Sequence, residues 1–158
     1  MRKILISACF LGKKVRYDAD SKTLFHPLII LWQSQNRLIS ICPEVEGGLP
    51  IPRPPAEIQN YSNSNNNIIM TSTGVDVSQA FKKGAQQALQ LCQQQHIEFA
   101  LLKESSPSCG NHFIYDGSFS NKKIVGQGVT TQLLQQHGIK VFSEDNIEVL
   151  AQALDQYD

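Results

Sequence analysis

The sequence predicts a single α/β domain in which a parallel sheet is flanked by helices. Short apolar runs bounded by turn residues, such as residues 99–102, are typical of strands that are buried on both faces. Segments with apolar residues at three- and four-residue spacing, typical of helices, alternate with these runs. The chain has 158 residues, an ordinary size for one domain, so we expect residues 1–158 to form one unit.

In the first part of the chain, residues 3–7 and 38–41 are short apolar runs that predict two strands. A helix is expected over residues 27–35, because it begins with a proline, whose missing amide hydrogen costs little in a first turn. Residues 44–57 contain too many prolines for a helix or a central strand and predict an ordered, rigid loop. The Asn- and Ser-rich residues 59–67 predict a mobile surface loop.

In the middle of the chain, residues 68–70 predict a short edge strand or one arm of a hairpin. A long helix is expected from Asp76 or Ser78, either of which can cap it, to about residue 95. Its apolar stripe includes Cys92. We interpret this cysteine as a small buried hydrophobic residue, because free cysteines behave in this way in protein cores.

The last part of the chain continues the alternation of strands and helices. Residues 113–119 contain an Asp-Gly pair that suggests a turn between two short extended pieces. A helix is expected over residues 126–137, ended by the glycine that follows it. Residues 139–142 predict the last strand, and Ser143 or Asp145 can cap a terminal helix.

Three of the four cysteines come directly after predicted strands or in the loop beyond one: Cys9, Cys42 and Cys109. If these strands lie parallel in one sheet, their carboxyl ends share an edge, which is where α/β sheets bind ligands. Cysteines in a reducing compartment favour metal binding or catalysis over disulfides. We therefore expect a metal centre at this edge, and the alternative is three unrelated thiols at strand ends.

The nature of such a centre stays open at this point. Iron–sulfur clusters normally take four cysteine ligands, so a [4Fe–4S] cluster on three would keep one iron open to substrate as a Lewis acid. Zinc is the alternative, because Cys109 and His112 have a CxxH spacing and the histidine could complete a four-coordinate site. Redox dithiol chemistry is a weaker third choice, because the cysteines form no local pair.

Several polar residues around these cysteines are candidates for catalysis or binding. Glu44, two residues beyond Cys42, is the best-placed carboxylate for proton transfer. Ser106 and Ser108 flank a proline before the third cysteine and could supply hydroxyl hydrogen bonds. Arg16 and Tyr17 could contact a small ligand. For each of these residues, an ordinary loop or turn role is the alternative.

Composition excludes several classes of partner. Positive and negative side chains balance to a formal charge of zero, and no Lys/Arg cluster is present, so we expect no nucleic-acid polymer as partner. The sequence contains no apolar run of roughly 20 residues that could span a membrane, and the first apolar run is too short for a signal peptide. We therefore expect a cytoplasmic protein.

Several motifs together resemble a short bacterial family that includes the thiouracil desulfidases. The longest is CPEVEGGLPIPRPPAE at residues 42–57, and others are SPSCG at residues 106–110 and IYDG at residues 114–117. The resemblance covers nearly the whole chain and implies a Rossmann-like α/β fold. It also implies that Cys9, Cys42 and Cys109 bind a [4Fe–4S] cluster.

The same resemblance implies catalytic roles for Glu44 and Ser106. The implied reaction is non-redox: the open iron captures the sulfur of 2-thiouracil, water replaces it at the carbon, and uracil and hydrogen sulfide leave. The expected partner is thus a small thiolated nucleobase, with Ser108, Arg16 and Tyr17 as further candidates for binding it. The alternative function is a non-catalytic metal-binding sensor or accessory module that holds zinc or an iron–sulfur cluster.

Overall fold

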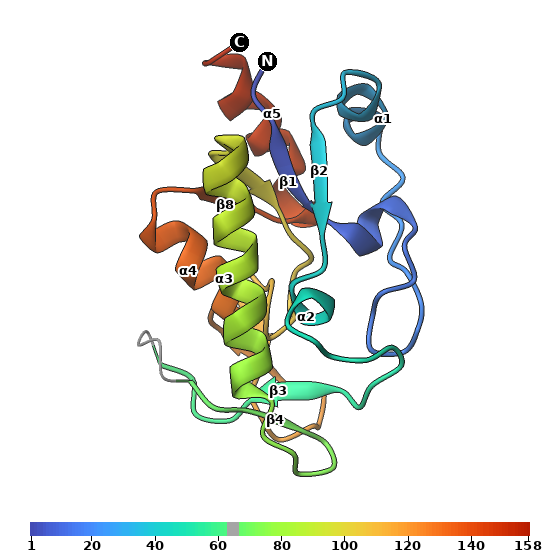
Figure 1. The fold of residues 1–158 in the computed structure, drawn as a ribbon, viewed down its shortest axis with the longest axis vertical. Coiled ribbons are helices and arrows are strands. Elements are labelled where there is room, and N and C mark those ends of the chain that lie inside the picture. Colours follow the sequence, from blue (N-terminus) through green and yellow to red (C-terminus); the bar gives the residue numbers. More distant parts are fainter. Residues whose placement is uncertain (63–66) are drawn as a thin grey trace.

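The computed structural model describes residues 1–62 and 67–158, and within them four strands form a central sheet (Figure 1). The strands are β1 (Ile4–Ser7), β2 (Leu38–Ile41), β5 (Phe99–Leu101) and β8 (Lys140–Phe142). They lie in the order β2-β1-β5-β8, and every neighbouring pair is parallel. The predicted α/β fold with a parallel sheet is confirmed, and each of its strands lies where the sequence predicts it.

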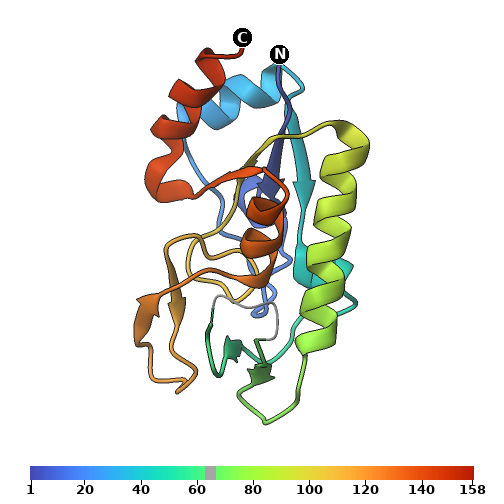
Figure 2. The ribbon, with the colours of Figure 1, turned by 90° about the vertical axis from the view of Figure 1, so that its left-hand side faces the viewer.

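Two helices cover each face of this sheet (Figure 2). One face packs on α3 (Ser78–Gln95) and α4 (Val129–Gln136), and the other packs on α1 (Pro27–Ser34) and α5 (Ile147–Asp155). Cys92 of α3 is 1% exposed in the first core, so its interpretation as a buried hydrophobic residue is confirmed. Burial raises the pKa of this thiol to about 12.

The predicted capping residues lie close to the helix starts, but α3 and α5 begin at other caps, Val77 and Asn146, which make no capping hydrogen bond through their side chains. Pro27 occupies the first turn of α1, where the preceding histidine caps the helix. Asp76 accepts a hydrogen bond through Oδ1 from the backbone N–H of Ser78 at 2.9 Å, at the start of α3. The Ser143 hydroxyl accepts from the N–H of Asp145 at 3.2 Å and caps a 3₁₀ turn, η2 (Glu144–Asn146), that leads into α5.

The prediction that residues 44–57 form only a loop is wrong at both ends. A short helix, α2 (Pro43–Glu46), overlaps the start, and a strand, β3 (Ala56–Ile58), begins at its end. The prolines at 50, 52, 54 and 55 interrupt regular structure only between these two elements. Pro43 suits the first turn of α2, where the N–H that it lacks would have no helical partner.

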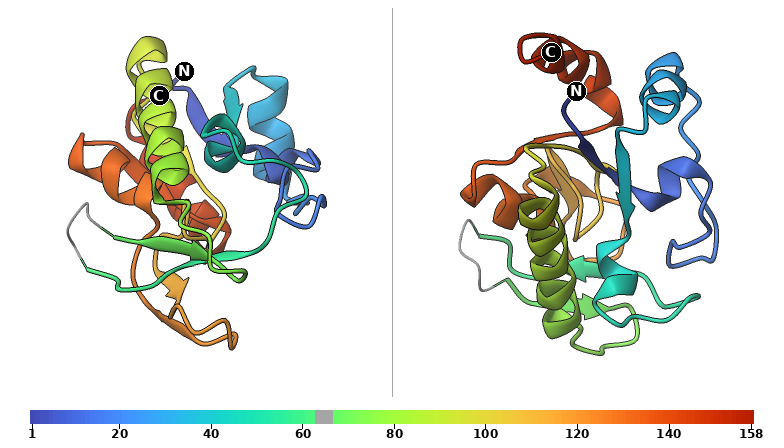
Figure 3. Two further views of the ribbon diagram at one scale, coloured as in Figure 1. Left: turned by 60° about the horizontal axis from the view of Figure 1, so that its bottom comes forward. Right: turned by 45° about the horizontal axis from the view of Figure 1, so that its top comes forward.

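Two antiparallel hairpins lie beyond the carboxyl edge of the sheet (Figure 3). The first pairs β3 with β4 (Ile69–Thr71), which confirms the expected hairpin arm. The second pairs β6 (Phe113–Tyr115) with β7 (Lys123–Val125). The predicted turn between two extended pieces is present, but the second piece begins later than expected, because the connection takes positive φ angles at Gly117, Phe119 and Asn121.

The predicted mobile loop at residues 59–67 falls partly outside the described residues, which omit 63–66. At its edges, Asn67 is 3% exposed, and its side-chain oxygen accepts from the N–H of Ser62 at 2.9 Å. None of the helices in the described ranges has the length and apolar character that a membrane crossing needs.

Candidate metal centre and active site

The carboxyl ends of β2, β1 and β5 lie side by side, and each predicted thiol follows one of them (Figure 1). Cys9 lies in the 3₁₀ turn η1 (Ala8–Leu11), Cys42 precedes α2, and Cys109 lies in the loop after β5. All three are free thiols and line one cavity of about 430 Å³. The structure therefore brings together three sulfur atoms that are far apart in the sequence.

The thiols influence one another electrostatically. Burial raises the pKa of Cys9 to about 11, with a smaller contribution from Cys42, while the positive charges of Arg16 and Lys103 act in the opposite direction. Burial also raises the pKa of Cys42, and it raises that of Cys109 together with the negative groups around it. Three thiolates would repel one another here. A bound metal centre removes this penalty, because its positive charge stabilises the deprotonated form of its ligands.

The donor set suits an iron–sulfur cluster, because thiolates are the ligands that such clusters take. Cys9 and Cys109 are buried, Cys42 is half-buried, and all three line the same cavity. In the described part of the chain, no three His, Cys, Asp or Glu side chains form a group that could hold a metal ion.

Glu44 lies in the first turn of α2 and lines the cavity beside Cys42. Its carboxylate pairs with Arg53 at 3.4 Å, and the guanidinium is nearly buried. Burial raises the pKa of Glu44, and Arg53 opposes that effect. Arg53 also donates to the carbonyl oxygens of Val15 at 3.1 Å and Pro50 at 3.2 Å. The arginine thus fixes the carboxylate between two loops that frame the cavity.

Ser106 lines the cavity and supports the loop of Cys109. Its hydroxyl oxygen accepts a hydrogen bond from the backbone N–H of Cys109 at 2.6 Å. Its carbonyl oxygen accepts from the N–H of Gly110 at 2.9 Å. Because the hydroxyl oxygen acts as an acceptor toward the loop, its own hydrogen can be donated toward the cavity.

Ser108 differs from the expectation that its hydroxyl binds substrate. Its side chain is fully buried, and its hydroxyl pairs with that of Thr130 at 2.8 Å. Ser108 is absent from the described residues that line the cavity, although Cys109 donates to its hydroxyl at 3.7 Å. The physical reason is the turn at Pro107, which directs Ser106 to the cavity and Ser108 toward α4.

Arg16 and Tyr17 both line the cavity. The Arg16 guanidinium pairs with Asp18 at 3.3 Å and lies over the Tyr17 ring, 5.5 Å from its centre. The carbonyl oxygen of Tyr17 accepts from the N–H of Arg53 at 2.8 Å. The structure thus gives these two residues a position from which they can contact a ligand.

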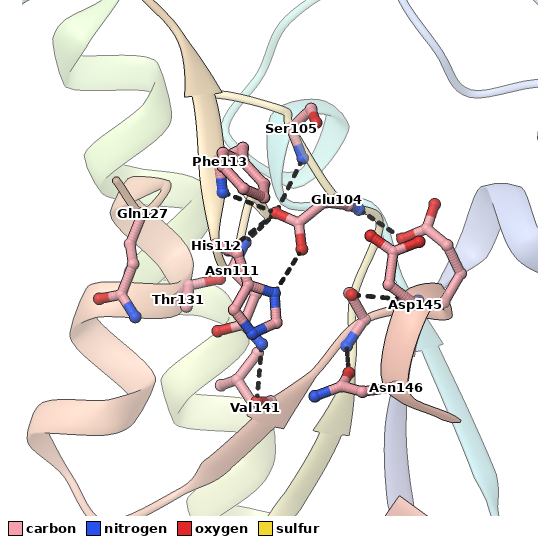
Figure 4. A network of polar contacts seen from close by, with 12 residues as sticks. Glu104, Ser105, Asn111, His112, Phe113, Gln127, Thr131, Val141, Asp145 and Asn146 are labelled. Atoms are coloured by element: carbon pink, nitrogen blue, oxygen red, sulfur yellow. Dashed lines mark hydrogen bonds and ion pairs between the residues drawn. The ribbon is translucent and has the colours of Figure 1, made fainter. Parts of the chain in front are cut away.

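His112 has a different partner from the one expected for a closed zinc site. Its Nδ1 atom lies 2.9 Å from a carboxylate oxygen of Glu104 (Figure 4). Among the described residues, the cavity lining includes Glu104 and omits His112. The predicted CxxH spacing therefore does not bring the histidine to the three thiols.

The sequence leaves open whether Lys103 faces the cavity or only marks the strand end, and in the structure it lines the cavity two residues after β5. Sequence reasoning missed Glu104, Tyr115 and Lys123, which also line the cavity. Glu104 could have been found, because a charged residue shortly after a buried strand resembles the placement of Glu44. Tyr115 and Lys123 depend on how the second hairpin folds back and leave no local pattern in the sequence.

Three close backbone contacts at glycines hold the loops of the site in place. A Cβ atom at Gly84 of α3 would overlap the carbonyl oxygen of Pro43, and one at Gly47 would overlap that of Ala80. Glycine therefore lets α2 approach α3 closely. At the start of α4, a Cβ atom at Gly128 would overlap the backbone of Ser108. The loops that carry Cys42 and Cys109 thus pack directly on helices.

Comparisons with known proteins agree with this site. A family model described as 2-thiouracil desulfurase matches residues 4–146, a range that includes every residue lining the cavity. The uncharacterized protein YbbK of Bacillus subtilis strain 168 is 37% identical over 151 residues, which cover 91% of this chain and 97% of the relative. A solved structure of the [4Fe-4S]-dependent thiouracil desulfidase TudS is 48% identical, with a TM-score of 0.93 and 99% of each chain covered.

Proposed function

The chain belongs to the 2-thiouracil desulfurase family, and on this basis we propose that it removes sulfur from a thiolated pyrimidine base such as 2-thiouracil. The products are uracil and hydrogen sulfide, and the cofactor is a [4Fe–4S] cluster. The observation that carries this proposal is that three free cysteines from three neighbouring strand ends line one cavity. Cys9, Cys42 and Cys109 would hold the cluster. When bound through three cysteines, a cluster supplies an iron with an open position that binds sulfur as a Lewis acid.

The overall reaction balances without a redox partner. Water supplies the oxygen that replaces sulfur on the ring carbon, and its two hydrogens leave with the sulfide. One group must therefore accept a proton from water, and a proton must reach the departing sulfur. A carboxylate at the cavity wall can do both in turn, as a general base and then as a general acid.

Glu44 is the residue that we assign to this proton transfer. Its carboxylate lines the cavity beside Cys42, and Arg53 holds it in one orientation. Ser106 donates its hydroxyl hydrogen to the pyrimidine ring of the substrate, because its oxygen already accepts from the N–H of Cys109. Arg16 and Tyr17 contact the same ring from the loop that follows η1, since both line the cavity. The walls keep bulk water away from the reacting atoms.

We also infer a cytoplasmic location. The three cavity thiols are free, and a reducing compartment keeps them available for a metal centre. The partner is a small molecule.

The test begins with protein purified without oxygen, in which iron and acid-labile sulfide are measured. We expect a brown protein that releases sulfide from 2-thiouracil or 4-thiouracil. Alanine variants at Cys9, Cys42 and Cys109 should lose iron, whereas Cys92→Ala, the matched control in the core, should retain it. A colourless protein with one zinc would favour the metal-binding module instead. Equal iron loss in all four variants would contradict the assigned ligands.

A further inference from the structure

Glu104 binds the chain on the far side of Cys109 through one carboxylate oxygen (Figure 4). Its Oε1 atom accepts backbone N–H groups from Asn111 at 2.7 Å, His112 at 2.9 Å and Phe113 at 3.1 Å. The other oxygen, Oε2, lies 2.9 Å from Nδ1 of His112. One side chain at the end of β5 thus closes the loop that carries Cys109.

The base of this loop is also fixed to the rest of the sheet. The N–H of Glu104 donates to Oε1 of Glu144 at 2.7 Å, and Oε2 of Glu144 pairs with Lys103 at 2.6 Å. The N–H of Lys103 donates to the hydroxyl of Ser7, at the end of β1, at 2.9 Å. Glu104 therefore belongs to a segment that is hydrogen-bonded to the end of β1, directly before Cys9.

The bonds to Glu104 favour its charged form strongly. Burial alone would raise the pKa of this carboxyl, but hydrogen bonds from His112, Phe113 and Asn111 lower it to about 2. Glu104 is 7% exposed, so these bonds have little competition from water. Hydrogen bonds to an ionised acceptor are the strongest kind in proteins. The three N–H groups belong to residues that begin two positions after Cys109, so their position limits where its sulfur can lie.

We propose that Glu104 is a positioning residue: by accepting hydrogen bonds from the N–H groups of Asn111, His112 and Phe113, it determines the position of the Cys109 sulfur. The inference rests on the proposed function only in that it treats Cys109 as a cluster ligand. The placement of the loop itself is a property of the polypeptide. It can therefore be measured both with the cluster and without it.

The first experiment measures how fast the cluster-loaded protein loses iron to a chelator. The loss is monitored through the visible absorbance of the cluster. We expect Glu104→Gln to lose iron at least about tenfold faster than the unchanged protein, because a neutral amide holds the three N–H groups less strongly. The matched control is Glu57→Gln. Glu57 is a buried carboxylate that accepts from the N–H groups of Gly117 at 2.9 Å and Phe119 at 3.2 Å, in a loop without cysteines.

The second experiment uses the full chain after removal of the cluster and maps alkylation of each cysteine by iodoacetamide with mass spectrometry. We expect Glu104→Gln to raise the rate at Cys109 by about tenfold, through local opening of its loop. Cys92, in the core, reacts only through global unfolding, so its rate should stay far below that of Cys109 even where the variant is less stable overall. Comparable rates at the two cysteines, or no rise at Cys109, would overturn the proposal in favour of general destabilisation.

Should Glu104→Gln fail to fold, His112→Ala provides the milder variant. It removes the ring contact to Oε2 and keeps the three backbone bonds, so we expect a smaller but still selective increase at Cys109. No selective increase would count against the proposal. Because alkylation needs neither cluster nor substrate, a protein that binds no iron would disprove the proposed function while leaving this measurement informative.

Discussion

At the scale of single residues, the cavity combines three thiols with one carboxylate and one hydroxyl whose orientations are fixed by neighbours. Arg53 holds Glu44, and the N–H of Cys109 holds the oxygen of Ser106. Such fixed groups need little reorganisation when a substrate arrives, which is how enzymes lower the cost of proton transfer. The consequences can be tested one side chain at a time.

Replacing Glu44 by glutamine should remove proton transfer while leaving the cluster bound. We expect sulfide release from 2-thiouracil to fall by about a hundredfold or more, the usual range for loss of a general acid or base. Iron content should stay the same. Glu46→Gln is the matched control, because Glu46 lies in the same helix turn and is exposed. Unchanged sulfide release in Glu44→Gln would refute the catalytic role.

Replacing Ser106 by alanine should have a different effect from replacing Ser108 by alanine. Ser106→Ala should reduce sulfide release per iron, because it removes a hydroxyl from the cavity wall. Ser108→Ala should instead lower the free energy of unfolding by about 1–3 kcal/mol, because the buried Thr130 hydroxyl loses its partner. Urea unfolding and a sulfide assay distinguish the two effects, and an equal loss of activity per iron in both would contradict the assignment.

Glu104 should make the free energy of unfolding depend on pH in the acidic range. Its pKa is about 2 in the folded protein and close to 4.5 in an unfolded chain. The charged carboxylate therefore stabilises the fold above about pH 4.5, and this contribution is lost as the pH falls toward 2. We expect Glu104→Gln to be less stable by roughly 3 kcal/mol at pH 7, and the difference should shrink toward pH 2. Urea titrations at several pH values measure it, and a constant difference would argue against this linkage.

At the scale of elements, short helices and loops of the site are held by direct backbone contact with the long helix and with α4. The pair formed by α2 and α3 is the clearest case, because Gly47 and Gly84 each face a backbone carbonyl of the other helix. A side chain at either position would separate the helices. Since α2 begins directly after Cys42, its distance from α3 also determines where that thiol lies.

Gly84→Ala should therefore affect both stability and cofactor binding. The new methyl group would overlap the carbonyl oxygen of Pro43, so we expect a loss of about 1–3 kcal/mol or more in unfolding free energy and a lower iron content. Gln86→Ala is the matched control on the same helix, because Gln86 is exposed. Normal stability and iron content in Gly84→Ala would show that α2 can shift without cost.

At the scale of the whole molecule, we expect the fold to form without the metal centre. Two apolar cores cover the two faces of the sheet, and one of them contains none of the three cavity cysteines. The fully buried side chains include Leu5 and Ile6, which point to opposite faces of β1. The cavity lies at the carboxyl edge, where Cys109 also belongs to one of these cores.

Removal of the cluster should accordingly leave the protein folded but less stable. We expect an unchanged far-ultraviolet circular dichroism spectrum and an unfolding temperature lower by at least about 4 °C, because a ligand bound only to the folded state stabilises it. Thermal unfolding before and after chelation measures the effect. A chelated protein without secondary structure would contradict the independence of the cores.

The positions of the cysteines could be predicted because they depend on local patterns. Buried strands leave continuous apolar runs, and adjacent parallel strands must end at one edge, so Cys9, Cys42 and Cys109 were expected to meet. The helix α2 could not be predicted with the same reasoning, because the many prolines after it argue against a helix in that segment. The helix contains only one proline, Pro43, which occupies its first turn. The late start of β7 was missed because three residues in its connection take positive φ angles.

The sequence by itself determined the α/β architecture, the strand ends that carry the thiols and the motifs that place the chain in its family. Only the tertiary structure decided that Ser106 reaches the cavity while Ser108 is buried against Thr130, and that Glu104 gathers three backbone N–H groups behind Cys109. The physical reason is the range of the forces involved. Apolar periodicity depends on residues that are close in sequence, whereas hydrogen-bond partners depend on which distant segments the folded chain brings into contact.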